Sequence, residues 1–529
     1  MEVQDGRGAR LGRAAAGRPG FAALATALYA AASVLATWPA VEHVGSHFLA
    51  NRNTSLAEAS PGDHLQTGWN LWLFGHQLAA GRAPWLDPYS FRPELAPRVN
   101  FQGLVFGLPY WPLFALFGAV VAWNIFTLLT FVGAGGAMCA WLRSVGLPRG
   151  AALVGGLAFA LAPYRVAQST GHLLGPISLF LPLALLALEK RRPLLGAAAI
   201  AAIPLSGQVN LALGAVPFFI AYAFVRGRGL RDALPGAGLA LIAAALVQRY
   251  AIQGSLHEHG RSLAEVSHYS ADWIGFVSRH GSGETFVFLG WLTPVVALAG
   301  LALLLRQRRY GISALLVAAI VVPVVIALGT HLPTYRLLRH VVPGLKATRV
   351  PERLLPLACL ALAALLAVAL VRARPWVIAL ALVLVAADSH VRLYHATRAD
   401  EGNTAYAAVR NAPPGRLLEL PVFLPDIHLN STYLYYDMTA QRQHPSGYST
   451  TAPRPAFRTV RRLRVLTCGT WSRDMARLHI RYVAVHGAFY EEFFPRCRTR
   501  AEATLRRHGF RRLTTGGAVT VWGSRLNPG

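Results

Sequence analysis

Long apolar runs, many of them ended by arginine, constrain the fold of this chain more than any other feature. They recur from Phe21 to Ala387, and most are roughly 15 to 22 residues long, about the length that a helix needs to cross a membrane. Hydrophobic residues make up 54% of the chain and charged residues only 14%, which argues against a soluble enzyme. The sequence therefore predicts a polytopic α-helical membrane protein.

The basic residues predict how this protein lies in the membrane. The formal net charge is +27, and much of that charge lies in short turns such as Lys190–Arg192 and Arg306–Arg309. Cytoplasmic turns carry such charge by the positive-inside rule, so a nucleic-acid partner is not needed to explain it. With the N-terminus inside, about eleven crossings place every strongly basic short turn on the cytoplasmic side. Phe101–Phe117, which glycine and proline interrupt, is expected to be a re-entrant or interfacial helix rather than a crossing.

This topology divides the chain into successive parts. Residues 1–20 are expected to form a basic cytoplasmic tail, residues 21–392 a transmembrane domain with a first outer loop at 42–102, and residues 393–529 a small extracytoplasmic α/β domain. The last part changes to mixed polar and apolar sequence, with three short strands and one amphipathic helix, at Arg416–Val422, Arg481–His486, Ala518–Gly523 and Thr499–His508. A composition rich in alanine, arginine and glycine indicates a GC-rich bacterial genome, and hence the plasma (inner) membrane.

The four cysteines fall into two pairs. Cys139 and Cys359 lie in apolar runs and are expected to pack there as small hydrophobic residues. Cys468 and Cys497 lie in the segment that the topology exports, where a disulfide is chemically permitted. Sharing a domain does not establish the geometry of a bond, so a disulfide and two free thiols both remain open.

The first outer loop holds the sharpest candidate for chemistry, Asp63 in Pro61-Gly62-Asp63-His64. A carboxylate facing a pocket can act as general base toward a hydroxyl group or hold a divalent cation. Two plainer interpretations stay open. Asp63 is also a suitable N-cap for a helix that begins at His64. The tryptophans that follow it fit an ordinary aromatic belt at the membrane surface.

Two arginines near the outer end of a late apolar run are candidate anion ligands. Arg349 and Arg353 stand on the side of the membrane where the positive-inside rule does not call for them. Guanidinium groups suit a phosphate, although either arginine could instead pair with Glu352. Arg165, His172 and His64 are expected on the same side and are candidates to line the same cavity. The sequence contains no Walker loop, no His-Glu-x-x-His pair and no Cys-x-x-Cys pair.

With these residues placed, the chain resembles the GT-C-fold polytopic membrane glycosyltransferases, the bacterial relatives of protein mannosyltransferases and aminoarabinose transferases. The resemblance covers roughly Phe21 to His390 and rests on short motifs that follow the first apolar run or flank later ones. They are Asp63 before Trp69-Asn70-Leu71-Trp72, Ala162-Pro163-Tyr164-Arg165 before His172, and Arg349-Val350-Pro351-Glu352-Arg353. Leu418-Glu419-Leu420-Pro421 and His444-Pro445-Ser446-Gly447-Tyr448-Ser449 extend it less closely into the C-terminal part.

The resemblance implies a sugar donor linked to a polyprenyl phosphate and transfer at the outer face to an envelope glycan, lipid or protein. Asp63 would take the place of the catalytic acid of the first loop, and Arg349 and Arg353 would contact phosphate. Many members of the family carry two adjacent acids in that loop, whereas this chain has one, so the divalent cation stays open. A transporter of lipid-linked substrates and a non-catalytic envelope assembly protein are the alternatives from other classes.

Overall fold

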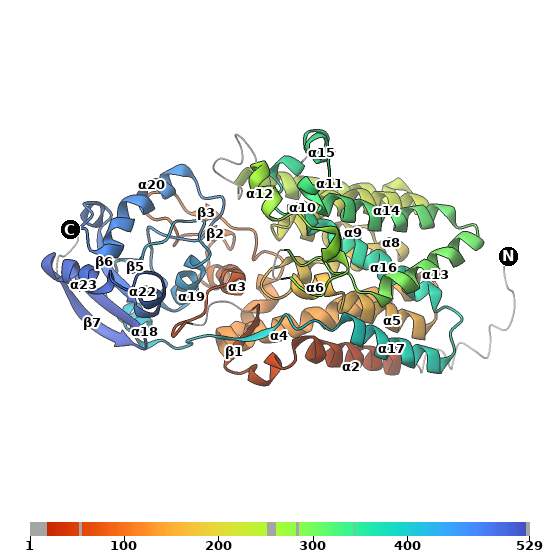
Figure 1. Ribbon diagram of the computed structural model, residues 1–529, viewed down its shortest axis with the longest axis horizontal. Coiled ribbons are helices and arrows are strands. Elements are labelled where there is room, and N and C mark those ends of the chain that lie inside the picture. Colours follow the sequence, from red (N-terminus) through yellow and green to blue (C-terminus); the bar gives the residue numbers. More distant parts are fainter. Residues whose placement is uncertain (1–17, 52–55, 251–260, 282–284, 343, 525–529) are drawn as a thin grey trace.

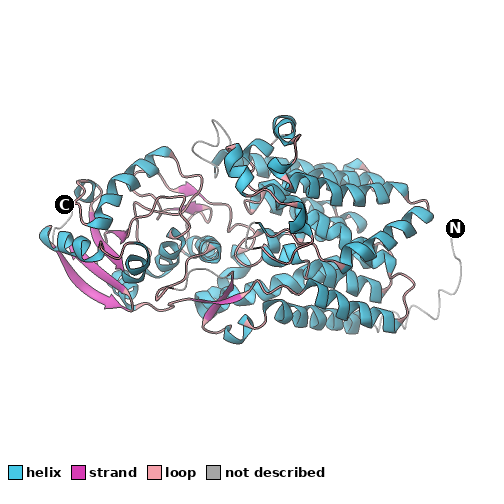
Figure 2. Ribbon diagram, viewed as in Figure 1, coloured by secondary structure: helices cyan, strands magenta, loops and turns pink. Residues whose placement is uncertain are grey.

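The computed structural model describes residues 18–51, 56–250, 261–281, 285–342 and 344–524. The molecule is elongated, with a bundle of helices at one end and a mixed helix-and-strand part at the other (Figure 1). The described helices run mostly along the long axis, and most strands lie in the part that contains the C-terminus (Figure 2). Most of the expected cytoplasmic tail falls outside the described residues.

Apolar helices build the bundle. Within the described ranges, five regions are long and apolar enough to cross a membrane: α2 (Arg18–Thr37), α4 (Gly107–Ser144), α11 (Leu230–Tyr250), α14 (Tyr310–Ala327) and η7 (Pro351–Leu354) with α16 (Leu355–Ala369). Shorter apolar helices lie between them: α5 (Arg149–Ala160), α8 (Phe180–Glu189), α9 (Pro193–Leu205), α10 (Val209–Val225), α13 (Leu292–Arg306) and α17 (Pro375–Ser389). A membrane-type helical bundle is confirmed, whereas the count of about eleven crossings stays a prediction.

The 38-residue helix α4 is two helical segments joined at Gly118, where the backbone turns to φ 78° and ψ −177°. A straight helix of that length would extend about 57 Å, nearly twice the hydrocarbon thickness of a bilayer. The first segment exposes Leu108, Leu116 and Phe117, which suits the expected interfacial helix. The backbone N–H of Ala119, which starts the second segment, donates to Glu401 Oε1 at 2.8 Å.

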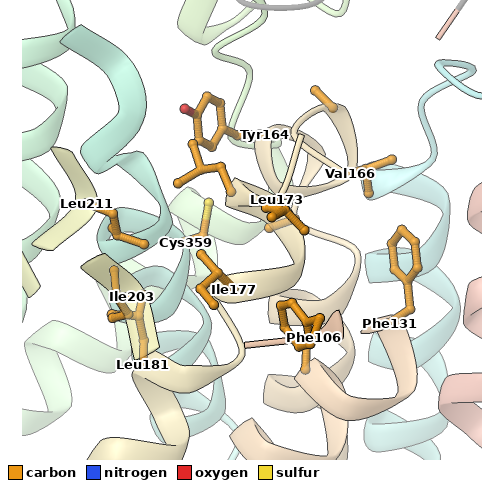
Figure 3. Close-up of a cluster of buried hydrophobic side chains, with 14 of the residues drawn as sticks. Phe106, Phe131, Tyr164, Val166, Leu173, Ile177, Leu181, Ile203, Leu211 and Cys359 are labelled. Atoms are coloured by element: carbon orange, nitrogen blue, oxygen red, sulfur yellow. The ribbon is translucent and has the colours of Figure 1, made fainter. Parts of the chain in front are cut away.

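The bundle is closely packed around large apolar side chains. Figure 3 shows side chains from several helices meeting in one buried cluster, including Phe106, Phe131, Leu181 and Ile203. Leu173, which directly follows His172, belongs to this cluster and is 3% exposed. The turn that carries His172 is therefore anchored in the core of the bundle.

The C-terminal segment contains a four-stranded sheet in the order β5 (Arg416–Leu420), β6 (Ile480–His486), β8 (Val519–Ser524) and β7 (Phe510–Gly516). β5 and β6 are parallel, and the other two pairings are antiparallel. The surrounding helices are α18 (Thr404–Asn411), α19 (Asn430–Ala440), α20 (Arg454–Leu463), α21 (Asp474–Arg477), α22 (Gly487–Phe493) and α23 (Arg498–Arg507). A disulfide joins Cys468 and Cys497, which decides the question that the sequence left open.

The first loop and the C-terminal segment form one continuous structure. β1 (His47–Ala50) pairs with β4 (His395–Arg398) in antiparallel register. Glu58 is fully buried against His486 of β6, and its other oxygen accepts the backbone N–H of Ala488 at 3.0 Å. Helix α3 (Asp63–Ala79) packs against α19, and both lie where the bundle meets the C-terminal part (Figure 1).

The remaining elements are short. In the part that follows α2 they are η1 (Ala40–His43), β2 (Leu86–Asp87), β3 (Arg98–Val99), α6 (Pro163–Ala167) and α7 (Leu174–Ile177). Between α11 and α16 they are α12 (Leu263–His268), η3 (Trp273–Phe276), η5 (Gly329–His331), α15 (Tyr335–Val341) and η6 (Leu345–Ala347). In the C-terminal segment, η8 (Arg464–Cys468) ends at the first cysteine of the disulfide.

Candidate active site

Asp63 is the first residue of α3 and is not its N-cap. The N-cap position belongs to Gly62, and no side-chain capping bond is made there. A carboxylate in the first turn of a helix is stabilised by the helix dipole without being used in a cap. The side chain of Asp63 is 37% exposed and lines a cavity. Its carboxylate oxygens can therefore contact other side chains that line the cavity.

His172 is the nearest of those side chains. Its Nε2 atom lies 2.8 Å from Asp63 Oδ2. The turn that carries it is docked on α3, because Thr67 Oγ1 donates to the carbonyl oxygen of Gly171 at 2.7 Å. A Cβ atom at Gly171 would lie 3.3 Å from the Cβ of Asp63, so a larger residue there would push the two segments apart by a few tenths of an ångström. Two segments far apart in the sequence thus form one carboxylate–imidazole pair.

The surroundings of Asp63 hold its carboxyl group in the ionised form. Burial acts to raise its pKa, but the charge and hydrogen bond of His172, with smaller contributions from His428 and Arg353, outweigh burial and lower the pKa below its ordinary value. Tyr448 Oη donates to Asp63 Oδ1 at 3.4 Å. At neutral pH Asp63 is consequently a carboxylate able to accept a proton.

Asp63 and His172 open onto a cavity of about 880 Å³. Polar side chains of the first loop and of the C-terminal segment line it, together with apolar side chains of α10 and α11 such as Leu213 and Val247. Such a cavity joins a polar chamber to the apolar helices of the bundle. A ligand with a polar head and a hydrocarbon tail suits both parts.

Four arginines and three aspartates line this cavity, so its charge balance is positive. Its lining includes Arg98, Arg261, Arg349 and Arg353. The guanidinium carbon of Arg349 lies 4.7 Å from the ring centroid of Tyr269. Burial lowers the pKa of Arg261, and the neighbouring charges of Arg349 and Arg353 add to that effect against the opposing charge of Glu265. Like charges this close favour a bound anion, and guanidinium groups suit phosphate oxygens.

Five of the six side chains proposed from the sequence line the cavity: Asp63, His64, His172, Arg349 and Arg353. Arg165 is the exception, because it does not line the cavity as the sequence predicted. It is fully buried, and its guanidinium group donates to the carbonyl oxygens of Thr130 and Ala160 at 2.9 and 3.0 Å and to Ser178 Oγ at 3.0 Å. Arg165 therefore ties neighbouring helices of the bundle together.

His64 lines the cavity but does not suit a phosphate. It is 2% exposed, and its ring lies 5.1 Å from that of Phe48 and 6.4 Å from that of Trp123. Burial lowers its pKa to about 3, although the charge of Asp63 acts in the opposite direction. A neutral imidazole among aromatic rings supports packing at the start of α3 and adds no positive charge to the cavity.

The lining also includes residues that were not singled out as site residues from the sequence, among them Arg261, His428 and Tyr448. Arg261 lies in a polar loop that the sequence predicts on the outer side, so the reasoning that identified Arg349 also applies to it. Tyr448 belongs to the tail motif that resembles the glycosyltransferases, but its position beside Asp63 depends on the packing of the C-terminal segment. His428 has no signal in the sequence that separates it from other histidines.

The side chains around Asp63 do not fit a metal site. No three His, Cys, Asp or Glu side chains come together as ligands anywhere in the described ranges. The oxygens of Asp63 face His172 and Tyr448, and the nearby positive charge comes from arginine. We therefore derive no step through a divalent cation.

Solved structures show which fold this is. An arabinofuranosyltransferase, AftD from Mycobacteria, matches over 96% of this chain with a TM-score of 0.60 at 17% identity. ArnT from Cupriavidus metallidurans matches over 96% of this chain and 98% of its own in the apo state, with a TM-score of 0.52 at 15% identity. Its structure bound to undecaprenyl phosphate gives a TM-score of 0.51. The protein therefore has the GT-C fold, as the sequence motifs suggested.

These likenesses concern the fold alone. The chain spans 40% of the length of the mycobacterial arabinofuranosyltransferase. No protein-family model and no curated protein sequence matches it.

Proposed function

We propose that this protein is a membrane glycosyltransferase that takes a sugar from a polyprenyl-phosphate donor and transfers it to a hydroxyl group of an envelope glycan, lipid or protein. The observation that carries this proposal is the cavity that holds the Asp63–His172 pair together with Arg261, Arg349 and Arg353. Base and anion site share one chamber, and the chamber adjoins apolar helices. The bound undecaprenyl phosphate in an ArnT structure of the same fold supports this choice of donor.

In the proposed reaction the phosphate of the donor binds to the arginines and its polyprenyl chain lies along the apolar helices. The acceptor hydroxyl loses its proton to the Asp63 carboxylate while its oxygen bonds to the anomeric carbon of the sugar. The bond between that carbon and the phosphate oxygen breaks, and the negative charge goes to the departing phosphate. The arginines stabilise that charge, which grows as the bond breaks. A single displacement of this kind inverts the anomeric centre.

We further propose that the cavity faces the outside of the plasma membrane. The disulfide between Cys468 and Cys497 supports an oxidising compartment for the C-terminal segment. The basic turns, such as Lys190–Arg192, support a cytoplasmic location for the opposite ends of the helices. On this proposal residues 393–529, together with the first loop at 42–102, form the extracytoplasmic part.

The test uses the full chain reconstituted in liposomes with polyprenyl-phosphate sugars labelled in the sugar. Envelope extract supplies the acceptors. Transfer of the label to the extract, with stoichiometric release of polyprenyl phosphate, is the expected result. If the labelled lipid appears unchanged in the opposite leaflet, the protein is a transporter. If no tested donor reacts or moves, the catalytic proposal fails.

A further inference from the structure

A buried cluster outside the cavity holds the segment that brings Tyr448 to Asp63. Residues 444–446 pair with residues 89–92 of the first loop through three backbone hydrogen bonds. The N–H groups of His444, Phe91 and Arg92 donate to the carbonyl oxygens of Tyr89, Ser446 and His444, at 3.0, 3.0 and 2.9 Å. We call this pairing the clasp. It joins the first loop to the C-terminal segment just before the chain enters the cavity at Tyr448.

The clasp is tightly packed. A Cβ atom at Gly447 would come within 2.9 Å of the ring of Phe91 and 3.0 Å of the Cβ of Ser90. Gly447 therefore cannot carry a side chain without separating the two segments. Residues 448–451, which follow, all line the cavity. A shift of the clasp would move this whole stretch relative to Asp63.

Three carboxyl side chains, each from a different element, lie around the clasp. Asp87 accepts the N–H groups of Tyr89 and Ser90 at 2.8 and 3.2 Å, which fixes the turn of the first loop. Glu419 of β5 accepts the hydroxyl of Ser446 at 3.1 Å. Asp87, Glu419 and Asp437 are each no more than 6% exposed. Three buried carboxyl groups need a positive partner, because burying unpaired charge is costly.

His444 is that partner. Its side chain is 1% exposed, and its Nε2 atom lies 3.8 Å from Asp437 Oδ2. Burial acts to lower the pKa of His444, but the nearby carboxylate of Asp437 and the charges of Glu419 and Asp87 raise it to about 9. Burial also raises the pKa of Glu419 and of Asp87. Other ionisable groups also interact with these carboxyls from the surrounding elements. They are Arg98 and Tyr89 of the first loop, His76 of α3, Tyr406 of α18, Tyr433 of α19 and His486 of β6.

We propose that His444 is a positioning residue: held by Asp87, Glu419 and Asp437, it keeps the clasp closed and so keeps Tyr448 on Asp63. None of these four side chains except Asp87 lines the cavity. His444 acts on the reaction through Tyr448 and does not touch substrate. The link to catalysis rests on the proposed function, whereas the link to the clasp stands on the contacts alone.

The pH dependence of the clasp follows from the raised pKa of His444. The pKa of His444 is raised in the folded protein, so its stabilising contribution is complete below about pH 6.5, the ordinary value for histidine. That contribution declines as the pH rises and is lost above about pH 9, where the folded protein releases the proton. The clasp should therefore be closed at neutral pH and loosen in alkaline solution.

Hydrogen exchange of the full chain in nanodiscs, read by mass spectrometry, tests the clasp without any assay of activity. In His444→Gln, peptides that cover residues 89–92 and 444–451 should lose protection at least about tenfold at pH 7. In the wild type the same loss should appear only as the pH passes about 9. The control is His508→Gln, which changes an exposed histidine of the same C-terminal segment. Unchanged protection in His444→Gln would overturn the proposal.

Activity then tests the link to Asp63. Tyr448→Phe should leave exchange at the clasp unchanged and lower kcat, with little effect on the KM for donor. In His444→Gln kcat should also fall, and the alkaline decline of the wild type should disappear. If the clasp loosens but kcat and its pH profile stay as in the wild type, His444 is structural only and the positioning role is wrong. If no donor reacts at all, the proposed function fails while the exchange result still decides the clasp.

Discussion

At the scale of single residues, the carboxyl group of Asp63 is both ionised at neutral pH and accessible from the cavity. Its pKa is held down by His172, which lies 2.8 Å away, while part of its side chain still faces the cavity. A general base needs a free lone pair and room for the substrate, and both are present. The arginines add the positive charge that a phosphate leaving group requires. Each of these groups can be changed singly.

Replacing His172 with Gln should move the acidic limb of the transfer reaction to higher pH. Asp63 works as a base only when ionised, so activity falls as the pH drops through its pKa. Without His172, burial is opposed only by the weaker influences of His428 and Arg353, and the pKa of Asp63 should rise. In turnover measured from pH 4 to pH 8, the wild type should show no loss from protonation of Asp63, because its pKa lies below that range, whereas His172→Gln should lose turnover toward pH 4. An acidic limb that stays in place would contradict this role of His172.

Replacing Arg353 with Gln should weaken the binding of polyprenyl phosphate. A hydrogen bond to a charged group contributes about 1.5 to 3 kcal/mol, which corresponds to a rise in Kd of roughly 10- to 100-fold. Binding to the detergent-solubilised protein can be followed by calorimetry. Arg458→Gln, on the exposed side of α20, is the matched control and should bind as the wild type does. Equal affinities in both variants would remove Arg353 from the phosphate site.

The sequence predicted much of the candidate site, because several of its residues can be recognised from their immediate neighbours in the chain. Asp63, Arg349 and Arg353 were recognised from their positions beside apolar runs on the outer side. Arg165 was misplaced because its partners are carbonyl oxygens of neighbouring helices, which no side-chain pattern reveals. Tyr448 reaches Asp63 across 385 residues of sequence, and only the folded chain brings them together.

At the scale of elements, the two segments of α4 depend on a cap from a distant part of the chain. Gly118 breaks the helix, and the exposed N–H of Ala119 is satisfied by Glu401, which lies just beyond β4. The cap fixes the point where the first helical segment of α4 ends and the second begins. It also ties the C-terminal segment to the bundle.

Glu401→Ala should therefore destabilise the protein by about 1 kcal/mol, the usual effect of losing an N-terminal cap. The midpoint of thermal unfolding, measured in detergent, should fall by about 1 °C, because the shift per kcal/mol becomes smaller as the chain becomes longer. Glu492→Ala, an exposed glutamate of α22, should leave the midpoint unchanged. A midpoint equal to the wild type in Glu401→Ala would show that the second segment does not need this cap.

The apolar helices of the bundle were easier to predict than the short strands that join distant parts of the chain. The predicted run Val209–Val225 coincides with α10, because a continuous apolar segment specifies its own hydrogen bonds. β1 and β4 pair although one precedes and the other follows most of the apolar helices in the sequence. A four-residue strand also carries little signal by itself. β7 was missed because its exposed arginines and threonines hide the alternation of a strand.

At the scale of the whole molecule, the first loop and the C-terminal segment together enclose the cavity at one end of the bundle. β1 with β4, Glu58 with His486, and the clasp each join the two. A substrate that entered from the lipid would meet the basic wall near α11 and η7, and one from outside would meet the polar wall of the C-terminal segment. The proposed outward-facing cavity predicts one orientation in the membrane.

Single cysteines test that orientation in intact cells. Cysteine at Arg458, on the exposed face of α20, should react with a membrane-impermeant maleimide. Cysteine at Arg308, in the exposed turn between α13 and α14, should react only after the cells are opened. The native Cys139 and Cys359 are buried, and Cys468 and Cys497 are bonded to each other, so the background is low. The reverse pattern of labelling would place the cavity in the cytoplasm.

The central claim is that Asp63 is the base of a glycosyl transfer from a polyprenyl-phosphate donor. The direct measurement compares release of polyprenyl phosphate by the wild type and by Asp63→Asn, with the Kd for polyprenyl phosphate determined on the same preparations. We expect turnover to fall at least about 100-fold while the Kd changes by less than about threefold, because the asparagine keeps the shape of the side chain but cannot take the proton. Wild-type turnover in Asp63→Asn would contradict the account.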